Sequence, residues 1–153
     1  MIDFHLRFYS LRSYERIIDL LAVADFNEIP SEPGAFVFGT NDGTKFIYPW
    51  GSSPIFYIGQ TEDLRRRFSN HRRRIVEALQ DVSAKSWWPR YQFSAAFARD
   101  CAWYRVQSGQ RPQILAEDLI RDFRGQYGAI PVANASLRSW AMQATLADDQ
   151  EEN

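Results

Sequence analysis

The stretch from Pro54 to Arg74, PIFYIGQTEDLRRRFSNHRRR, constrains the fold of this chain more than any other. Its first part, Ile55 to Ile58, is a run of β-branched and aromatic residues of the kind found in buried strands. Gly59 is expected to end the strand, and Thr61 is expected to cap a helix that follows it. The stretch therefore predicts a strand that leads almost directly into a helix.

The predicted helix carries six arginines and one histidine within ten residues. At about 100° per residue, the stripe that faces the core consists of Leu64, Phe68, Ile75 and Leu79. Arg67, His71 and Arg74 share a second stripe at the margin of the core, whereas Arg66 and Arg73 point into solvent. Because Tyr57 ends the preceding strand, it can converge with Arg67 and His71 on one cleft. The simpler alternative is a solvated basic helix that covers a sheet.

The residues from about Pro33 to Ser136 resemble the GIY-YIG nuclease family. The resemblance rests on five ordered elements, which are Gly34-Ala35-Phe36, Tyr57-Ile58-Gly59, Arg67 with His71, Glu117 and Asn134. It implies an α+β fold with a small three-stranded antiparallel sheet flanked by helices. Under this interpretation, residues 1–32 form an N-terminal strand and helix extension packed on the main domain. Residues 33–136 form the nuclease-like domain, and residues 137–153 form a C-terminal helix and an acidic tail.

The local patterns predict the following elements. Strands are expected at Phe4–Phe8, Gly34–Phe38, Phe46–Tyr48, Ile55–Ile58 and Ala102–Val106. Helices are expected from Ser13 through Leu21, from Leu64 through Leu79, from Pro112 to Gly125 and from Leu137 to Leu146. Turns or breaks are expected at Asn41–Gly43, Trp50–Pro54, Asp81–Arg90 and Pro131–Asn134. Phe46–Tyr48 is expected to return along the first motif strand after the Asn41–Gly43 turn.

Two adjacent carboxylates lie on the helix that begins at Pro112. The apolar face of this helix is formed by Leu115, Leu119 and Phe123. Glu117 falls just outside the border of that face, while Asp118 falls on the opposite, solvent side. A charge at the edge of the core is costly unless it is paired or holds a metal, so Glu117 is the candidate ligand. An ordinary helix carboxylate is the alternative.

The resemblance implies a metal-dependent DNA endonuclease that hydrolyses phosphodiester bonds at a single-metal site. Glu117 would hold one Mg²⁺ or Mn²⁺, a cation that keeps most of its waters when one carboxylate binds it. Arg67 would bind the phosphate oxygens. Tyr57 and His71 would position or deprotonate the attacking water, and Asn134 would orient the site by hydrogen bonds.

Phe36 departs from the family pattern, because the first motif normally ends in tyrosine. Two accounts are open. Tyr57 with His71 suffices, with Tyr48 as a possible second hydroxyl, or the domain binds nucleic acid without cutting it. A third hypothesis is a protein-interaction domain in which the arginine helix meets an acidic partner.

Charge and composition indicate which binding partner and which cellular compartment to expect for this protein. The net charge is −1, but the stretch from Gln60 to Arg74 has six arginines against two carboxylates. The expected partner is DNA, double-stranded or branched, bound by Arg65, Arg66, Arg72, Arg73 and Arg74. A homodimer or partner protein is expected to add specificity. The single Cys101, the lack of an apolar run of ~20 residues and the lack of a signal-peptide pattern favour a cytoplasmic protein.

Overall fold

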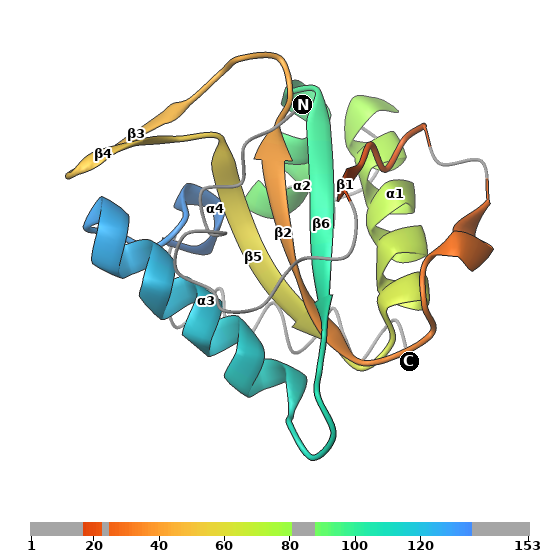
Figure 1. Ribbon diagram of the computed structural model, residues 1–153. Coiled ribbons are helices and arrows are strands. Elements are labelled where there is room, and N and C mark those ends of the chain that lie inside the picture. The colour runs from red at the N-terminus through yellow and green to blue at the C-terminus, as the bar shows by residue number, and fades with distance from the viewer. Residues whose placement is uncertain (1–16, 23–24, 81–87, 136–153) are drawn as a thin grey trace.

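The computed structural model describes residues 17–22, 25–80 and 88–135. Its centre is an antiparallel sheet with the strand order β1-β6-β2-β5 (Figure 1). The strands are β1 (Ile17–Ile18), β2 (Gly34–Thr40), β5 (Ile55–Thr61) and β6 (Arg99–Arg105). Three of them are long, and the two-residue β1 extends the outer edge of β6. The predicted α+β class, with a small antiparallel sheet and flanking helices, is confirmed.

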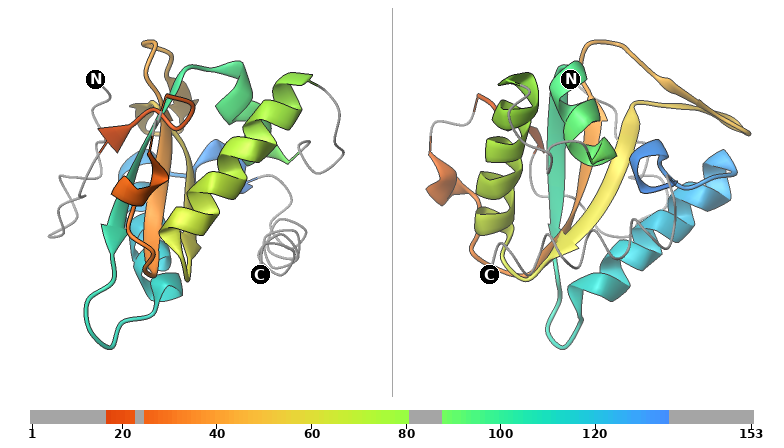
Figure 2. Two further views of the ribbon diagram at one scale, coloured as in Figure 1. Left: turned by 90° about the vertical axis from the view of Figure 1, so that its right-hand side faces the viewer. Right: turned by 180° about the vertical axis from the view of Figure 1, so that it is seen from behind.

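Helices cover both faces of this sheet. They are η2 (Phe26–Glu28), α1 (Leu64–Gln80), α2 (Pro89–Ala96), α3 (Pro112–Tyr127) and α4 (Val132–Ala135). In the edge-on view of Figure 2, α1 lies to one side of the sheet, and α3 contributes to the hydrophobic cluster of the opposite face. Within the described ranges, no helix is both long and apolar enough to cross a bilayer.

The central strand β2 has a core on each side. Ala35 and Val37 pack in the cluster that includes α3, whereas Phe36 and Phe38 pack in the cluster that includes α1. This alternation follows from the two-residue period of a strand. Every residue of β2 is buried, which explains why its central part, Ala35 to Phe38, is apolar without interruption.

Strand β5 and helix α1 follow the predicted order with different boundaries. The strand continues past Gly59 because this residue still pairs with Phe36 of β2. Asp63, not Thr61, caps the helix, because its Oδ1 accepts a hydrogen bond from the backbone N–H of Arg66 at 3.1 Å. Leu79 is 58% exposed, so the buried stripe of α1 ends earlier than predicted.

The segment between the two motif strands forms its own hairpin. Strand β3 (Phe46–Tyr48) pairs with β4 (Gly51–Ser53) and not with β2, so the prediction that it returns along the first motif strand is wrong. The tight turn is at Pro49–Trp50, and the predicted turn at Trp50–Pro54 is largely strand. Figure 1 shows this hairpin projecting away from the main sheet.

Three further local predictions differ from the structure. Ile17–Ile18, expected in a helix, pair with Ala102 and Cys101 of β6, as suits β-branched residues. Helix α2 was not predicted, although Pro89 in its first turn is a known start signal. The short helix α4 replaces the end of an expected loop. The predicted elements Phe4–Phe8 and Leu137–Leu146 lie outside the described residues.

The part of the N-terminal segment that the structure describes lies against the sheet and α1. Leu20 and Ile29 are buried in the α1-side cluster. The Nε of Arg65 donates a hydrogen bond to the backbone oxygen of Ile29 at 2.8 Å. These contacts attach the segment before Pro33 to the same core as the strands.

Gly59 is required by close packing, which leads to a stability prediction. A Cβ at this position would lie 2.5 Å from Cζ of Phe36 and 2.9 Å from Cε2 of Tyr57. We expect Gly59→Ala to lower the free energy of unfolding by about 1–3 kcal/mol or more, as overpacking does. Gly125→Ala is the matched control, because a Cβ there meets nothing within 4 Å, and it should stabilise α3 by about 0.5–1 kcal/mol. Urea unfolding measures both, and equal effects would contradict the packing argument.

Candidate active site

Helix α1 places Arg67 and His71 one turn apart on its buried side. Arg67 is 2% exposed, His71 is fully buried, and Arg74 is buried further along the same stripe. Arg66 and Arg73 are exposed. The predicted division of the arginines between the core margin and solvent is therefore found in the structure.

Tyr57 lies in the same buried cluster, on the face of β5 that packs against α1. The ring of Phe38 lies next to both His71 and Tyr57. It stacks on His71 with centroids 4.2 Å apart, and its centroid is 6.4 Å from that of Tyr57. The guanidinium of Arg67 lies 5.8 Å from the ring of Phe36, which is 6.1 Å from that of Tyr57. Tyr57, Arg67 and His71 are thus brought together around two phenylalanines.

Arg90 of α2 joins this cluster, and the sequence did not single it out. Its guanidinium lies 5.8 Å from the ring centroid of Tyr57 and 4.9 Å from that of Tyr91. It stacks over Trp88 at 4.2 Å and is only 4% exposed. The available signal was a cation next to aromatic residues just after Pro89. We call Tyr57, Arg67, His71 and Arg90 the basic cluster.

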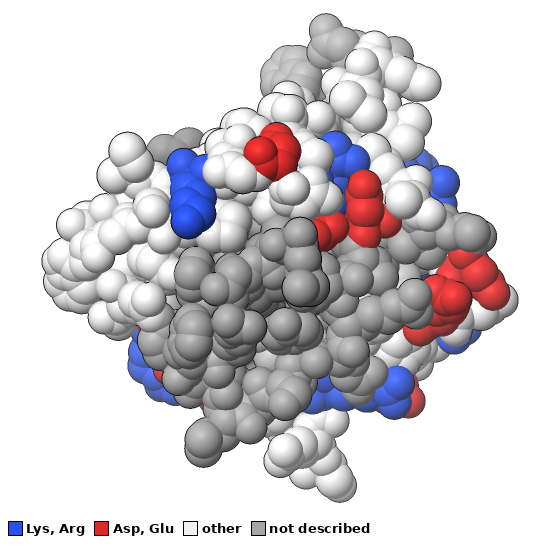
Figure 3. All heavy atoms as spheres, turned by 45° about the horizontal axis from the view of Figure 1, so that its top comes forward, with Lys and Arg blue, Asp and Glu red and all other residues white. Residues whose placement is uncertain are grey.

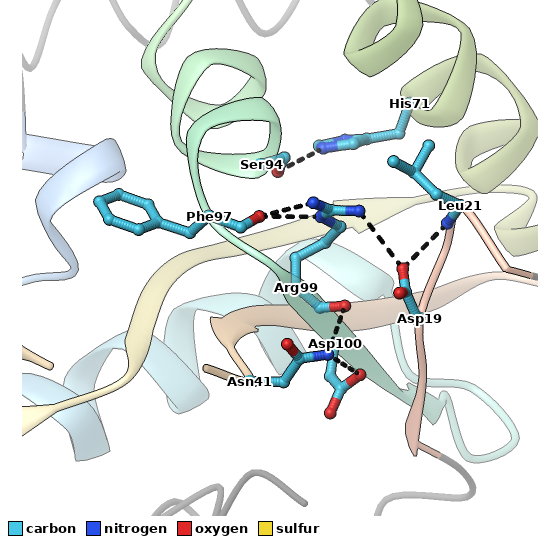
Figure 4. Close-up of polar contacts among 8 residues, drawn as sticks. All are labelled: Asp19, Leu21, Asn41, His71, Ser94, Phe97, Arg99 and Asp100. Carbon is cyan, nitrogen blue, oxygen red and sulfur yellow. Dashed lines mark hydrogen bonds and ion pairs between the residues drawn. The ribbon is translucent and has the colours of Figure 1, made fainter. Parts of the chain in front are cut away.

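Two linked hydrogen bonds between α1 and α2 indicate which ring nitrogen of His71 carries the proton. Figure 4 shows His71 and Ser94 pointing toward each other, with Nε2 and Oγ 3.2 Å apart. The Ser94 hydroxyl donates its one proton to the backbone oxygen of Arg90 at 2.7 Å. It therefore accepts from His71, which assigns the imidazole proton to Nε2. The basic lone pair is then on Nδ1, which has no hydrogen-bond partner within the described part of the chain.

His71 is held in its neutral form. Burial lowers its pKa well below the ordinary value, and the charges of Arg67 and Arg90 lower it further. A neutral imidazole with a free lone pair can accept a proton, which is what a general base requires.

This low pKa predicts how stability depends on pH. In the unfolded chain His71 titrates near ~6.5, whereas in the folded chain it stays neutral to lower pH. Below ~6.5 the unfolded state therefore binds a proton that the folded state does not. Stability should fall on acidification by up to about 1.4 kcal/mol per pH unit for this group, and should not change above that range. Denaturant unfolding from pH 5 to 8 measures it.

The control for this pH dependence is His71→Gln, which keeps a donor for Ser94 but does not titrate. The difference in stability between the natural protein and this variant should shrink as the pH falls below ~6.5. A difference that is constant across the range would mean that His71 has an ordinary pKa.

The C-terminal end of α2 is tied to the sheet and to the N-terminal segment. Arg99 donates two hydrogen bonds to the backbone oxygen of Phe97, at 2.7 and 3.0 Å. It also pairs with Asp19 at 3.5 Å. Nearby, Asn41 donates to Asp100 at 3.0 Å (Figure 4). This end of α2 is therefore well anchored beside the basic cluster.

Asn134 holds the outer edge of β5. Its Oδ1 accepts from the backbone N–H of Ile58 and its Nδ2 donates to the backbone oxygen of Ile58, both at 2.9 Å. The amide thus imitates a neighbouring strand and covers the sheet edge. Because Ile58 follows Tyr57 directly, this pair of bonds also positions the tyrosine.

Glu117 differs from its predicted setting. It is exposed, whereas Asp118 is partly covered and pairs with Arg121, so the relative exposure of the two carboxylates is the reverse of the prediction. The reason is helix geometry: at about 100° per residue, Glu117 lies about 160° from Leu119, the centre of the apolar face, whereas Asp118 lies about 100° from it. Among the described residues, no hydrogen bond or ion pair joins Glu117 to Tyr57, Arg67 or His71.

The described residues also show which side chains could bind a divalent cation. The described residues contain no group of three or more His, Cys, Asp or Glu that could hold a metal. Glu117 is an exposed hard oxygen donor, which suits a hydrated Mg²⁺ bound by one carboxylate and by substrate phosphate.

The structure also shows whether Tyr48 or position 36 could supply a second hydroxyl to the site. Tyr48 cannot supply a second hydroxyl, because it packs in the α3-side cluster. Its hydroxyl donates to the oxygen of Ile55 at 2.8 Å and accepts from Val132 N–H at 3.1 Å, and burial raises its pKa to about 12. Phe36 is fully buried between Phe38 and Phe68, so a hydroxyl at its ring would also be buried.

Several arginines predicted to bind nucleic acid are used in packing. Arg74 is buried and pairs with Glu77 at 3.0 Å. Arg72 lies over the ring of Phe26 at 5.4 Å, and Arg65 is half-buried. Only Arg66 and Arg73 of the predicted five are exposed. On the face drawn in Figure 3, basic and acidic side chains are interspersed and do not form one basic patch.

Comparison with known proteins leaves the family open. The chain matches no protein-family model, no curated protein and no solved structure.

Proposed function

We propose that this chain is a metal-dependent DNA endonuclease of the GIY-YIG type, acting on phosphodiester bonds. The observation that carries the proposal is the basic cluster, in which a neutral His71 and the phenol of Tyr57 lie beside two buried arginines. The Tyr57 hydroxyl makes no hydrogen bond with any described residue, and neither does Nδ1 of His71. The described residues therefore leave the hydrogen-bonding capacity of both groups unused, with His71 fully buried.

Each residue of the proposed site has a separate role in hydrolysis. Arg67 neutralises charge that develops on the phosphate. Tyr57 and His71 position the attacking water and remove its proton. Asn134 keeps the backbone next to Tyr57 in place through its two bonds to Ile58. Glu117 would hold a Mg²⁺ or Mn²⁺ ion, which supplies charge neutralisation when bound; because α3 packs on the face of the sheet opposite the basic cluster, this role requires the bound DNA to contact α3 as well.

A second candidate is a binding module of the same fold that does not hydrolyse DNA. Two observations favour it. The side chains of Tyr57 and His71 are almost entirely buried, and Phe36 lacks the hydroxyl of the family motif. A protein-interaction role for the arginine helix is less supported, because only Arg66 and Arg73 of the five surface candidates are exposed.

Incubation with supercoiled, nicked and branched DNA tests the proposal. With Mg²⁺ or Mn²⁺ we expect nicked or linear products, and with EDTA we expect none. Binding without cleavage in either metal would favour the second candidate. A lack of binding to all three DNAs at low salt would remove nucleic acid as the partner.

The exposed arginines make a separate prediction about salt. Each arginine that contacts phosphate releases counterions, so affinity for duplex DNA should fall steeply as salt rises. The double variant Arg66→Gln, Arg73→Gln should reduce the slope of log affinity against log salt by about 2, roughly 1 for each arginine that no longer binds a phosphate. Titrations between about 50 and 200 mM salt measure the slope. An unchanged slope would place the DNA on another surface.

A further inference from the structure

The β3–β4 hairpin carries the two most exposed large apolar side chains of the described residues. Ile47 of β3 is 91% exposed, and Trp50 at the turn is 69% exposed. Figure 1 shows the hairpin projecting beyond the main sheet, with its tip beside the C-terminal end of α3. The roles proposed above for the basic cluster and for Glu117 use neither of these side chains.

The hairpin is fixed to the rest of the protein through both ends of β3. The ring of Phe46 packs edge-on against Phe93 of α2, with centroids 5.4 Å apart. The ring of Tyr48 packs in the same way against Phe123 of α3, with centroids 5.0 Å apart. The hairpin therefore contacts helices on both faces of the sheet, and its exposed side chains are presented from an anchored support.

The indole of Trp50 lies against the C-terminal end of α3. A Cβ built at Gly128 would lie 2.8 Å from Cδ2 and 3.0 Å from Cε2 of the indole, so the ring lies directly on the backbone of this glycine. The backbone N–H of Trp50 also donates a hydrogen bond to the oxygen of Tyr127 at 3.0 Å. Gly128 caps α3 in the left-handed conformation, with φ 79°. The ring is thus held on one side, while most of its surface is open to solvent.

The charge around the hairpin favours a nucleic acid as the ligand of this surface. From Thr44 to Pro54 the chain has one cation, the exposed Lys45, and no carboxylate. Arg124, which is also exposed, lies one helical turn before Gly128. Neither cation forms an ion pair with a described carboxylate. A flat aromatic ring near unpaired cations suits a base and its phosphates.

The size of the surface argues against a second protein as the ligand. A stable protein–protein interface buries about 800 Å² on each partner. Strands of three residues with two exposed apolar side chains offer much less than this. One base stacked on one aromatic ring needs no larger surface.

We propose that Trp50 is a stacking platform for an unpaired nucleobase, so that the β3–β4 hairpin directs the protein to DNA that contains an unpaired base. The proposal rests on the proposed function for DNA as the ligand. A base that is already unpaired stacks on the indole at little cost, whereas a base in an intact duplex must first leave its neighbours, which offsets the gain. Ile47 has no flat ring and should not contribute to this preference.

The test compares two DNA duplexes of one sequence, one fully paired and one with a single unpaired base, in EDTA at constant ionic strength. Fluorescence anisotropy of labelled DNA measures both affinities. We expect the natural protein to prefer the duplex with the unpaired base by about 5- to 150-fold, the usual contribution of one base stacked on an aromatic ring. Trp50→Ala should bind both duplexes as the natural protein binds the paired one, and Trp50→Phe should keep part of the preference.

Ile47→Ala is the matched control, because Ile47 is exposed on the same hairpin but is not aromatic, and it should keep the full preference. Equal affinity of the natural protein for the two duplexes, or equal loss of preference in both alanine variants, would overturn the proposal. Sedimentation without DNA should give the same mass for the natural protein and Trp50→Ala. A lower mass for the variant would also overturn the proposal, because the ring would then lie against a second copy of the chain.

If Trp50→Ala does not fold, the indole Nε1–H signal of Trp50 in the NMR spectrum of the natural protein decides the question. It should shift with the duplex that has an unpaired base and much less with the paired duplex. Equal shifts with the two duplexes would overturn the stacking role.

These measurements are made without metal and without cleavage, so they are independent of the endonuclease assay. A preference that depends on Trp50 in a protein that never cuts DNA would support the stacking platform and favour the binding module. Metal-dependent cleavage by a protein that does not distinguish the two duplexes would support the endonuclease and remove the stacking platform.

Discussion

Tyr57→Phe is expected to lower the rate of plasmid cleavage by about 10²- to 10⁴-fold, the usual contribution of a group that positions or deprotonates water. The loss should be this large because neither Phe36 nor Tyr48 offers a second hydroxyl at the site. The fold should tolerate the change, since the Tyr57 hydroxyl makes no hydrogen bond with any described residue. Single-turnover cleavage of a supercoiled plasmid measures the rate.

Tyr104→Phe is the matched control. Tyr104 is also buried in a central strand, but it belongs to the α3-side cluster on the opposite face of the sheet. It should cleave at close to the natural rate, and both variants should bind uncleaved DNA in EDTA as the natural protein does. Cleavage by Tyr57→Phe at the natural rate would remove the tyrosine from the mechanism.

Glu117→Gln is expected to reduce Mg²⁺-dependent cleavage by at least about 10²-fold, because a bound metal supplies several kcal/mol of transition-state stabilisation. Because Glu117 is exposed, its substitution should leave the packing of the protein unchanged. The substitution removes a charge without opening a cavity or breaking an ion pair with any described residue. Folding and DNA binding in EDTA should therefore be unchanged, and the loss should appear only in the presence of metal.

Asp118→Asn provides the comparison for Glu117. Asp118 is the neighbouring carboxylate, and it already pairs with Arg121 on the same helix. Its loss should change stability slightly, as exposed pairs do, and should leave cleavage intact. Similar losses in the two variants would show that the helix carries a diffuse negative charge and no specific metal ligand.

The structure changes the interpretation of the arginine-rich helix. Its composition suggests a basic face for DNA, but packing divides its arginines among three uses. Arg67 enters the basic cluster, Arg74 is buried with Glu77, and Arg72 covers Phe26. Long side chains can bury their stems and direct their charge elsewhere. Counting arginines therefore overestimates the charge that this helix presents to a ligand.

The sequence by itself determined the elements whose signal is local and strongly periodic. The apolar run at Ile55–Ile58 and the 3.6-residue pattern of α1 predicted a buried strand followed by a helix. The same pattern separated Arg67 and His71 from the exposed Arg66 and Arg73. Each of these follows from the period of a single element.

Only the tertiary structure decided what depends on contacts between distant segments. It paired Phe46–Tyr48 with Gly51–Ser53, because strand pairing depends on where the chain can turn and pack. It brought Arg90 to Tyr57 from a segment that begins in a predicted break. A one-dimensional pattern identifies the face of a helix but not its neighbours.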